Sequence, residues 1–385
     1  MTFQFATANI LFGVKTSHTI PDRIKESSHR IFLVAGKNTK RVQWLVDMLI
    51  SEKRSVQTFS IPGEPTISII LEAVHQARQF KADVVVGIGG GSVLDTGKIV
   101  AALLANDGDL MDYLEVIGGG KAIQEKPVPY IAVPTTAGTG TEVTKNAVIT
   151  STEHQVKVSM RHAWMVPALA IVDPELTYSL PPDITASTGL DALTQLIEPL
   201  VTHQHNPLTD GICREGLIRI ARSLTKVYMD GTNKEAREDM SISSLFGGLA
   251  LANAKLGAVH GLAGPLGGMF NIPHGVICAR LLPHVIKTNL QALRKRDANS
   301  PQIDRFQELG CLLLGHQKAT ANDALSWIQT VCNQLSVPRL SEYGISRNAF
   351  HELIQKSLKA SSMKGNPIQL SEHELNEILE RAVYE

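Results

Sequence analysis

The 385-residue sequence has no excess of charge of either sign and little cysteine. Its 37 Lys+Arg residues balance 37 Asp+Glu residues, so it lacks the surplus of basic charge with which proteins hold nucleic acid. We therefore expect no nucleic-acid partner, and any anion site must be local. The four cysteines include no CxxC pair, which fits neither a disulfide framework nor a thiolate metal site and points to a reducing compartment; they are Cys213, Cys278, Cys311 and Cys332.

Long hydrophobic runs are also missing. No stretch approaches the roughly 18 uncharged apolar residues that a membrane span needs, and the first residues, MTFQFATANI, lack the basic-then-apolar pattern of a signal peptide. The sequence therefore predicts a soluble, cytoplasmic protein without a membrane partner. Hydrophobic residues still make up 43% of the chain, which excludes disorder as the dominant state and, at roughly 100–200 residues per domain, favours two domains.

The first half of the chain alternates strand and helix patterns. A stretch with Val42, Leu45 and Leu49 on one face predicts a helix, and a second helix is expected with Pro65 in its first turn. Because β and α elements alternate, we predict a mostly parallel sheet with helices on both faces. The predicted strands are apolar or β-branched runs at residues 30–36, 55–61, 82–88, 129–134 and 169–173.

The second half changes to helical periodicity. The change occurs at about residues 180–187, where Pro181 and Pro182 precede an Asp-Ile-Thr helix start. We predict an α/β dinucleotide-binding domain at residues 1–182 and an all-helical domain at residues 183–385. Its expected features are helical segments at 191–202, 207–228 and 239–254, an exposed loop at 294–302 and a charged C-terminal helix.

A glycine cluster follows the third predicted strand. Gly89, Gly90, Gly91 and Ser92 stand between that buried strand and a helix, where backbone N–H groups and the helix dipole favour a phosphate. The spacing is neither GxGxxG nor a Walker loop, because Ser92 occupies a glycine position of both patterns. We predict a phosphate site; a tight strand-to-helix turn without a ligand is the alternative.

A second loop follows the strand at 129–134. It carries Thr135, Thr136 and Thr139 together with two glycines. Carboxyl ends of parallel strands meet at one edge of a sheet, where open α/β folds bind nucleotides, so we expect both loops at that edge. A capped helix start at Thr139 or Thr141 is the simpler alternative.

The helical half contains residues that can ligate a metal. Asp191 and Gln195, at i and i+4, point the same way from one helix, and His260 and His274 stand among small residues. One Asp and two His from separate helices can hold Fe²⁺ or Zn²⁺ with an open position for substrate. The alternative is that the histidines are ordinary core or surface residues.

Together these motifs resemble the iron-containing (group III) alcohol dehydrogenase family over most of the chain. The likeness rests on residues 89–92 with Asp95 and Lys98, residues 134–144 (PTTAGTGTEVT), 191–194 (DALT) and 206–210 (NPLTD), and His260 with Pro273-His274-Gly275.

The resemblance implies a dehydroquinate-synthase-like architecture. A Rossmann-like domain and a helical domain would enclose a cleft where an alcohol or aldehyde meets nicotinamide, in a homodimer or larger homo-oligomer. It further implies catalytic roles and metal ligation for Asp191, His260 and His274, a fourth metal-ligand position at Gln195, and cofactor contacts at Gly89, Gly90, Gly91, Ser92, Thr135, Thr136, Thr139 and Lys157.

Two positions depart from the family pattern. Members typically place a histidine where this chain has Gln195, and many place another, thought to relay protons, at Gly264. A glutamine oxygen is a weaker donor than imidazole, so we expect a weak metal site. The alternatives are a metal-free site in which Gln195 and the histidines hydrogen-bond the carbonyl, or a Gln195 that only hydrogen-bonds Asp191. The proton must then come from the nicotinamide ribose, water, His203 or His205.

The residues after the first predicted strand indicate which cofactor is preferred. Family variants with an acidic residue there use its carboxylate to hold the adenosine 2′-hydroxyl. This chain instead has two lysines and no acid, so a 2′-phosphate is tolerated or attracted and we expect NADP, with NAD as the alternative. Solvated lysines are the simpler explanation. The predicted contacts are Gly36, Lys37 and Asn38, and the second lysine is Lys40.

We therefore predict an NAD(P)-dependent oxidoreductase that interconverts a small alcohol and aldehyde by hydride transfer, with a divalent metal polarising the carbonyl. Three alternatives stay open. A metal-independent, maleylacetate-reductase-like reductase of an unsaturated keto acid would bind the substrate carboxylate through Arg161 or Arg280. A dehydroquinate-synthase-like or glycerol-phosphate dehydrogenase enzyme needs a basic cluster that the motifs lack. The third is an inactive nucleotide-binding protein.

Overall fold

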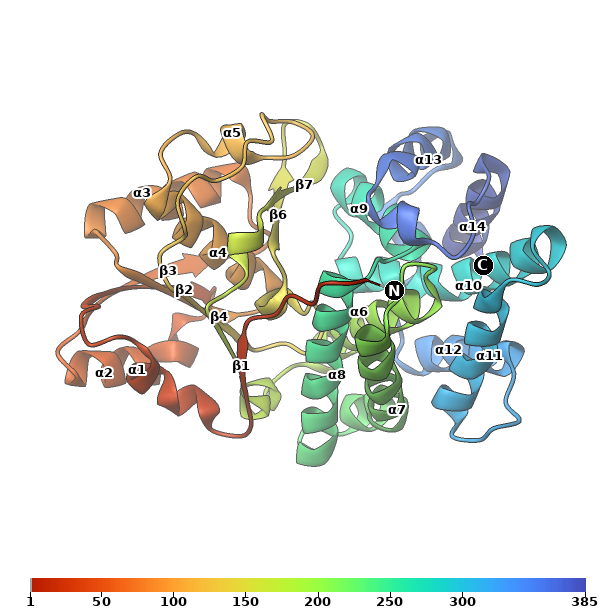
Figure 1. Cartoon of the computed structure of the whole chain (residues 1–385), viewed down its shortest axis with the longest axis horizontal. Helices are drawn as coiled ribbons and strands as arrows, with labels where there is room; N and C mark the ends of the chain where they lie inside the picture. The colour runs from red at the N-terminus through yellow and green to blue at the C-terminus, as the bar shows by residue number, and fades with distance from the viewer. Residues whose placement is uncertain (1) are drawn as a thin grey trace. The chain divides into compact units, whose positions relative to one another are not determined.

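The computed structural model describes residues 2–385, which cluster into two compact units. One comprises residues 7–136 and 140–177, and the other comprises residues 2–6, 137–139 and 178–385. The predicted boundary between residues 182 and 183 falls at the start of the first long helix of the second unit. Figure 1 follows the chain from red at its beginning to blue at its end.

The first unit is built on a six-stranded sheet whose order is β1-β8-β5-β4-β2-β3. Every pairing in it is parallel, which confirms the predicted mostly parallel sheet. Its strands are β1 (Asn9–Phe12), β2 (Arg30–Gly36), β3 (Ser55–Ile61), β4 (Val84–Gly89), β5 (Tyr130–Pro134) and β8 (Leu169–Val172). The sequence did not predict β1, nor the separate antiparallel pair β6 (Asn146–Ser151) and β7 (Val156–Arg161).

Strand β2 shows why this sheet is covered on both faces. Phe32 and Val34 belong to one apolar core, whereas Ile31 and Leu33 belong to another, because successive side chains of a strand point to opposite faces. Helices α3 and α4 pack on the first face and α2 on the second, as Figure 1 shows. The helices of this unit are α1 (Ile20–Arg23), α2 (Gln43–Ser51), α3 (Ile67–Phe80), α4 (Gly91–Ala105) and α5 (Leu110–Tyr113), with 3-10 turns at Thr16–Thr19, Thr39–Val42, Thr141–Val143, Ala163–Met165 and Pro174–Thr177.

The expected place of Pro65 in the first turn of α3 is wrong. The helix begins at Ile67, and Thr66 is its N-cap, whose hydroxyl accepts the N–H of Ile69. A threonine side chain at the N-cap satisfies a backbone donor that the first turn would otherwise leave free, so the helix starts after the proline.

The second unit is all helical, as predicted. It contains α6 (Pro182–Val201), α7 (Pro207–Met229), α8 (Lys234–Asn253), α9 (Ala258–Phe270), α10 (His274–Arg296), α11 (Pro301–Leu314), α12 (Ala321–Gln334), α13 (Phe350–Lys359) and α14 (Glu372–Tyr384), with 3-10 turns at Leu340–Tyr343, Arg347–Ala349 and Ser362–Gly365.

The loop expected at residues 294–302 is shorter than predicted. Helix α10 continues to Arg296 and α11 begins at Pro301, a residue whose fixed φ suits the first helical position. Ser300 and Gln302 are buried, and the Ser300 hydroxyl donates to Gln302 Oε1 at 2.8 Å. The loop itself comprises residues 297–300, of which 297–299 are exposed as predicted, and it ends in this internal hydrogen bond at the start of α11.

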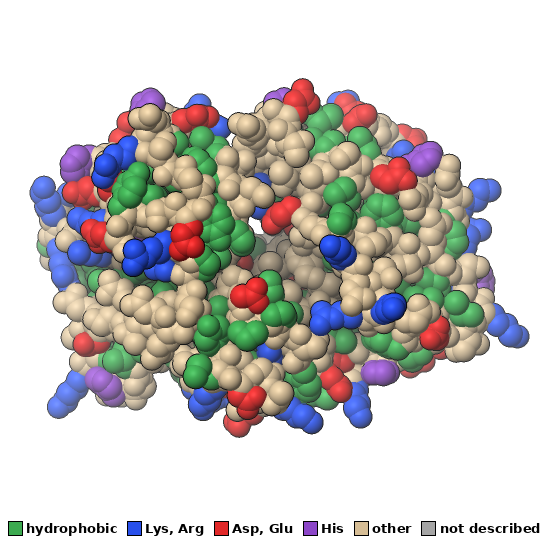
Figure 2. All heavy atoms as spheres, turned by 180° about the vertical axis from the view of Figure 1, so that it is seen from behind, with side chains coloured by type: hydrophobic (Ala, Val, Ile, Leu, Met, Phe, Trp, Pro, Cys, Tyr) green, Lys and Arg blue, Asp and Glu red, His purple; other side chains and the backbone are tan. Residues whose placement is uncertain are grey.

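The surface carries charges of both signs. Lys and Arg side chains are interspersed with Asp and Glu side chains over the face drawn in Figure 2. Within residues 2–385, no single helix combines the length and the apolar composition of a membrane span, and α8 with α9 meets that test only as a pair bent by 98°.

Candidate active site

Helix α6 presents three buried polar side chains along one side. Asp191, Gln195 and Glu198 stand at i, i+4 and i+7, a spacing that places side chains on the same helix face. The helix packs against α7, α8 and α10, so its polar side chains meet groups from other helices rather than water.

The turn between α9 and α10 places His274, whereas His260 lies in the first turn of α9. Helix α9 ends at Asn271, whose φ of 48° lies in the left-handed region, a common way to terminate a helix. The chain re-enters a helix after Pro273, so His274 becomes the first residue of α10, and Cys278 follows one turn later. Gly275 permits this arrangement, because a Cβ there would collide with the Ser187 carbonyl oxygen on α6.

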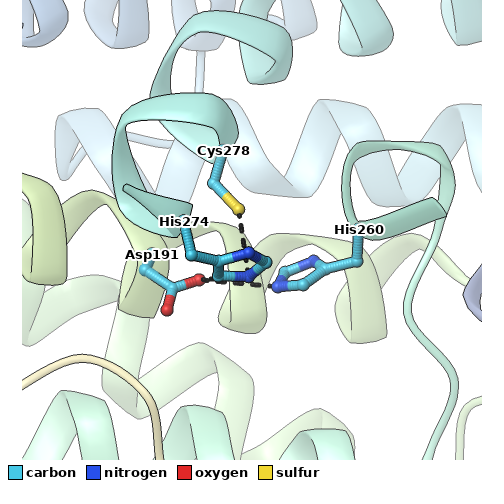
Figure 3. Close-up of side chains that lie close together, drawn as sticks. All are labelled: Asp191, His260, His274 and Cys278. Atoms are coloured by element: carbon cyan, nitrogen blue, oxygen red, sulfur yellow. Dashed lines mark hydrogen bonds and ion pairs between the residues drawn. The ribbon is translucent and has the colours of Figure 1, made fainter. Parts of the chain in front are cut away.

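Side chains from α6, α9 and α10 converge on one point in this unit. Asp191 Oδ1 lies 3.5 Å from His260 Nε2 and 3.6 Å from His274 Nε2. Cys278 Sγ lies 3.6 Å from His274 Nε2. One ligand atom from each of these four residues lies within 4.8 Å of the other three, and Figure 3 shows the carboxylate, the two rings and the thiol facing one another.

Glu198 orients the ring of His260. Its Oε2 lies 2.6 Å from His260 Nδ1, and its Oε1 accepts the N–H of Val259 at 2.7 Å. With Nδ1 engaged, Nε2 faces Asp191 and His274, the arrangement in which a carboxylate fixes a metal-ligating imidazole. A side chain at Gly257 would meet Glu198 Oε1 at 2.8 Å, so this glycine leaves room for the carboxylate.

Unpartnered atoms mark the centre. Among residues 2–385, the buried side-chain atoms without a hydrogen-bond partner include Asp191 Oδ1, Gln195 Oε1 and His260 Nε2. A buried polar atom left without a partner costs on the order of 1–3 kcal/mol, and two of these atoms, Asp191 Oδ1 and His260 Nε2, belong to residues of the cluster. Carboxylate oxygen, imidazole nitrogen and thiolate sulfur are the donors that divalent transition metals prefer, so this cluster fits a divalent cation.

The groups around the centre shift one another's protonation. Burial would raise the pKa of Asp191, but His274, His260 and the hydrogen bond from Gln195 hold it below its usual value. Burial would lower the pKa of His260, yet the carboxylates of Glu198 and Asp191 raise it to about 9. Burial raises the pKa of Cys278 well above its usual value. A cation bound here must therefore displace protons.

Gln195 lies beside the cluster. A hydrogen bond from its side chain helps to lower the pKa of Asp191. Its Oε1 lies 3.4 Å from where a Cβ on Gly247 would stand. The ligand role predicted for Gln195 stays a prediction, and this arrangement corresponds to the alternative in which it hydrogen-bonds Asp191.

In the α/β unit, the predicted cofactor loops follow neighbouring strands. Gly36 ends β2 and is followed by Lys37 and Asn38, Gly89 ends β4 and is followed by residues 90–92, and Thr135 and Thr136 follow β5, so all lie at the carboxyl edge of the sheet. The two central loops touch, because the Thr135 N–H donates to the Gly89 carbonyl at 2.9 Å. Gly90 is the N-cap of the 15-residue helix α4, whose start offers unpaired N–H groups to an anion.

Two predicted cofactor residues lie apart from those loops. Lys157, on β7, forms an ion pair with Glu64 at 3.0 Å, and only 12% of its side chain is exposed. Glu64 belongs to the loop that follows β3, which is also at the carboxyl edge. Thr139 clusters with the helical unit, together with residues 137 and 138.

The family-like residues Asp95, Lys98 and Glu142 form a buried ionisable cluster in the α/β unit. Lys98 Nζ donates to Thr144 Oγ1 at 2.9 Å and to the Asn146 carbonyl at 2.7 Å, and it lies 3.9 Å from Asp95 Oδ1. Burial lowers the pKa of Lys98 to about 8, and it raises that of Asp95 to about 6 and that of Glu142 to about 7. These charges tie α4 to the segment that follows β5.

The other candidate proton donors and arginines lie in structural networks. His205 Nδ1 is 3.0 Å from Asp210 Oδ2, which also pairs with Arg305 at 2.8 Å, and neither His203 nor His205 belongs to the cluster. Arg280 donates to the backbone carbonyls of residues 337 and 338. Arg161 pairs with Glu115 at 3.6 Å.

The NPLTD motif at residues 206–210 has a structural role. Asn206 caps α7, its side chain accepting the N–H groups of Leu208 and Thr209 at 3.1 Å, and Asp210 holds Arg305. The motif thus stabilises the start of a helix and takes no part in the chemistry of the cluster.

Sequence reasoning missed two residues of the site. Glu198 stands three residues after Gln195 on the same helix face, and helical spacing could have found it. Cys278 was set aside because the cysteines form no CxxC pair, although its position four residues after His274 places both on one helix face.

Sequence comparison places both parts of the chain in one family. The family described as iron-containing alcohol dehydrogenase matches residues 7–174, and the description "Fe-containing alcohol dehydrogenase family, C-terminal" matches residues 185–383. Long-chain-alcohol dehydrogenase 1 of Geobacillus thermodenitrificans is 36% identical over 88% of this chain and 86% of its own length. The 1,3-propanediol dehydrogenase of Klebsiella pneumoniae is 35% identical over 84% of this chain and 81% of its own length.

Solved structures share the whole fold. A 1,3-propanediol oxidoreductase has a TM-score of 0.91 at 30% identity, covering 99% of this chain and 100% of that chain. Sulfoacetaldehyde reductase from Bifidobacterium kashiwanohense, determined in complex with NAD⁺, has a TM-score of 0.88 at 28% identity and covers 100% of both chains.

The chain combines a parallel-sheet unit with a helical unit that holds a buried carboxylate–imidazole cluster. This architecture defines a class of two-part oxidoreductases, and the matches cover both parts. The chain belongs to the iron-containing alcohol dehydrogenase family. It is an oxidoreductase that acts on CH–OH groups, interconverting alcohols and aldehydes with NAD(P). The keto-acid reductase and the inactive nucleotide-binding protein are not favoured.

Proposed function

We propose that this enzyme interconverts a small primary alcohol and its aldehyde, prefers NADP(H), and uses a divalent cation held by Asp191, His260 and His274. The observation that carries the proposal is the group of buried atoms without hydrogen-bond partners at this point, above all Asp191 Oδ1 and His260 Nε2. When bound, the cation supplies Lewis acidity to the carbonyl oxygen and the nicotinamide supplies the hydride.

The chain's own residues prepare this chemistry. Glu198 holds Nδ1 of His260, so that Nε2 stays aimed at the centre. Burial excludes water from Asp191, which strengthens its attraction for a cation. At Gly264 a Cβ would have nothing within 4 Å, so the position where many family members carry a histidine is open space here. Proton transfer therefore uses water or the cofactor ribose.

The cofactor preference rests on the loop after β2. Lys37 is exposed at the carboxyl edge of the sheet, and residues 36–40 contain no acid. A cation near the adenosine ribose attracts a 2′-phosphate, whereas a carboxylate there would repel it. Backbone N–H groups at residues 89–92 and the start of α4 bind the pyrophosphate of either cofactor.

Steady-state assays with NADPH and NADH against a series of straight-chain aldehydes test this proposal. We expect a higher kcat/KM with NADPH, and Lys37→Ala should lower that preference by about fivefold, the value of one exposed charge contact. Lys25→Ala is the matched control, because Lys25 is exposed before β2, at the opposite edge of the sheet. Equal use of both cofactors, unchanged in Lys37→Ala, contradicts the NADP assignment.

Metal content is measured on the same protein. We expect about one divalent cation per chain, and dialysis against a chelator should abolish activity until metal is restored. Full activity in metal-free protein contradicts the Lewis-acid role and supports direct hydrogen bonding of the carbonyl by the histidines.

A further inference from the structure

We propose that Cys278 is the fourth protein ligand of the divalent cation, so that the centre is formed by Asp191, His260, His274 and Cys278 and favours zinc over iron. The inference rests on the proposed function, because it needs a cation held by the aspartate and the two histidines. It adds a thiolate that the lack of any CxxC pair had led us to exclude.

The spacing of the four side chains supports a four-coordinate centre. Zinc binds nitrogen and oxygen at about 2.0–2.2 Å and sulfur at about 2.3 Å, so neighbouring ligands of a tetrahedral ion stand roughly 3.3–3.7 Å apart. The aspartate oxygen lies 3.5 Å and 3.6 Å from the two imidazole nitrogens, and Cys278 Sγ lies 3.6 Å from His274 Nε2. These three separations match tetrahedral edges, and all four atoms lie within 4.8 Å of one another.

Local geometry aims the sulfur at this point. Cys278 is one helical turn after His274 on α10, so both side chains lie on one face of the helix. Cys278 is fully buried, with no exposed surface, and Figure 3 shows its thiol directed toward the His274 ring. Within residues 2–385, no other group of at least three His, Cys, Asp or Glu side chains comes together in this way.

Gln195 then serves Asp191 rather than the cation. A hydrogen bond from its side chain lowers the pKa of Asp191, and its Oε1 lies 3.4 Å from where a Cβ on Gly247 of α8 would stand. An amide bonded in this way positions the aspartate, as carboxylate ligands in metal sites commonly need. Since Gln195 takes this role, the fourth ligand comes from α10.

Thiolate ligation decides the metal. A soft sulfur donor favours zinc over Fe²⁺, and zinc also stands higher in the general order of affinity. On binding, the Cys278 S–H proton passes to solvent and the thiolate sulfur bonds to the cation. No oxidant or reductant is required.

Cobalt substitution tests the inference independently of turnover. The chelator-treated full-length protein is loaded with Co²⁺, and a near-ultraviolet sulfur-to-cobalt charge-transfer band is expected. Cys278→Ser should abolish that band and weaken zinc binding at least about tenfold. Cys332→Ser is the matched control: it is also buried, and its sulfur contacts the Ala279 carbonyl beside Cys278 without belonging to the cluster, so it should keep both the band and the affinity.

A rescue variant separates ligation from packing. In the Cys278→Ser background, Gln195→His supplies an imidazole from α6, so zinc affinity should recover while the band stays absent. X-ray absorption of the zinc-loaded, unsubstituted protein gives a readout that needs no variant: one sulfur at about 2.3 Å from zinc.

The outcomes distinguish the two proposals. If the unsubstituted protein binds cobalt and zinc without a sulfur contribution, the Cys278 assignment is overturned and the proposed function stands. If it binds no divalent cation at all, the metal part of the proposed function fails and the assignment fails with it. If it takes up iron in preference to zinc from an equimolar mixture while sulfur is bound, the predicted metal preference is wrong.

Discussion

The protein contains two buried ionisable clusters that differ in how they are completed. In the α/β unit, Lys98 lies 3.9 Å from Asp95, interacts electrostatically with Glu142 and donates to two oxygens of its own chain. In the helical unit, Asp191 and His260 keep atoms without hydrogen-bond partners. Both clusters contain residues that carry the family likeness.

The difference separates structural charges from functional ones. A buried charge survives when its chain supplies an opposite charge and hydrogen bonds, and the Lys98 cluster meets this condition internally. The Asp191 cluster meets it only in part: two histidines supply opposite charge, but Asp191 Oδ1 and His260 Nε2 are left without hydrogen-bond partners. Strong pKa shifts occur in both, so a shifted pKa alone does not identify the active site.

The largest effect is expected at the Asp191 cluster of the helical unit. Asp191→Asn removes the charge that attracts the cation, so kcat/KM should fall at least about a thousandfold, the several kcal/mol that a Lewis acid supplies. Metal content should fall with it, while stability of the metal-free protein changes little. Asp230→Asn, at an exposed residue at the end of α7, is the control. Unchanged metal content and turnover in Asp191→Asn would show that this cluster is also structural.

At the Lys98 cluster of the α/β unit, a substitution should lower the stability of the protein. Lys98→Met leaves Asp95 and Glu142 as buried carboxylates without their cation, which should lower the free energy of unfolding by about 3 kcal/mol. Urea denaturation at pH 8 measures it. Lys121→Met, which breaks an exposed pair with Asp112, should change stability by no more than about 0.5 kcal/mol. Equal effects of the two substitutions would contradict the structural role of Lys98.

Two glycines of the helical unit test the Asp191 cluster further, because this cluster depends on close packing of its helices. Gly275→Ala forces a methyl group against the Ser187 carbonyl, so it should cost about 2 kcal/mol and displace His274 from the centre. Gly264→Ala has open space and should be neutral or stabilising by about 0.5 kcal/mol. Thermal unfolding and metal content of the two variants measure the contrast, and a destabilised Gly264→Ala together with a neutral Gly275→Ala would reverse it.

The remaining effect appears only when the pH changes. The pKa of Glu142 rises on folding from 4.5 to about 7, so the folded protein holds a proton there that the unfolded chain releases. Its stabilising contribution is complete below pH 4.5 and is lost as the pH rises through 7. Glu142→Gln should therefore be more stable than the unsubstituted protein at pH 8, by up to about 3 kcal/mol for a shift of this size, and equal to it near pH 4. Exposed Glu153→Gln serves as the control; a pH-independent effect of Glu142→Gln would contradict the buried-proton account.

Strong local patterns made much of the fold predictable. The runs at residues 30–36 and 55–61 became β2 and β3 with the predicted bounds. Strand β2 is an apolar run in the sheet interior, whereas β3 mixes polar and apolar residues at the edge of the sheet. The strands β1, β6 and β7 were missed: β1 has only four residues and is largely exposed, and β6 and β7 alternate half-buried and buried positions in a two-stranded pair. Such strands gain their stability from partners distant in the chain.

The candidate site was predicted in part. Asp191, His260 and His274 were chosen by residue type and by the family likeness, and the structure brings them together. The hydrogen bond between Gln195 and Asp191, the contact between Glu198 and His260 and the presence of Cys278 at the centre depend on how α6, α9 and α10 pack. Helical spacing gives the face of a residue but not the neighbour that this face meets.

By itself, the sequence determined the alternation of strands and helices, the two glycine- and threonine-rich loops and the set of metal-ligating residue types. Each of these features follows from a local pattern of side-chain size, polarity and backbone freedom. Only the tertiary structure decided that Lys98 finds its partners within the chain whereas Asp191 and His260 keep unpartnered atoms. Whether a buried charge finds an opposite charge and hydrogen-bond partners depends on groups from other helices and strands. The positions of those groups are set by packing across the whole unit.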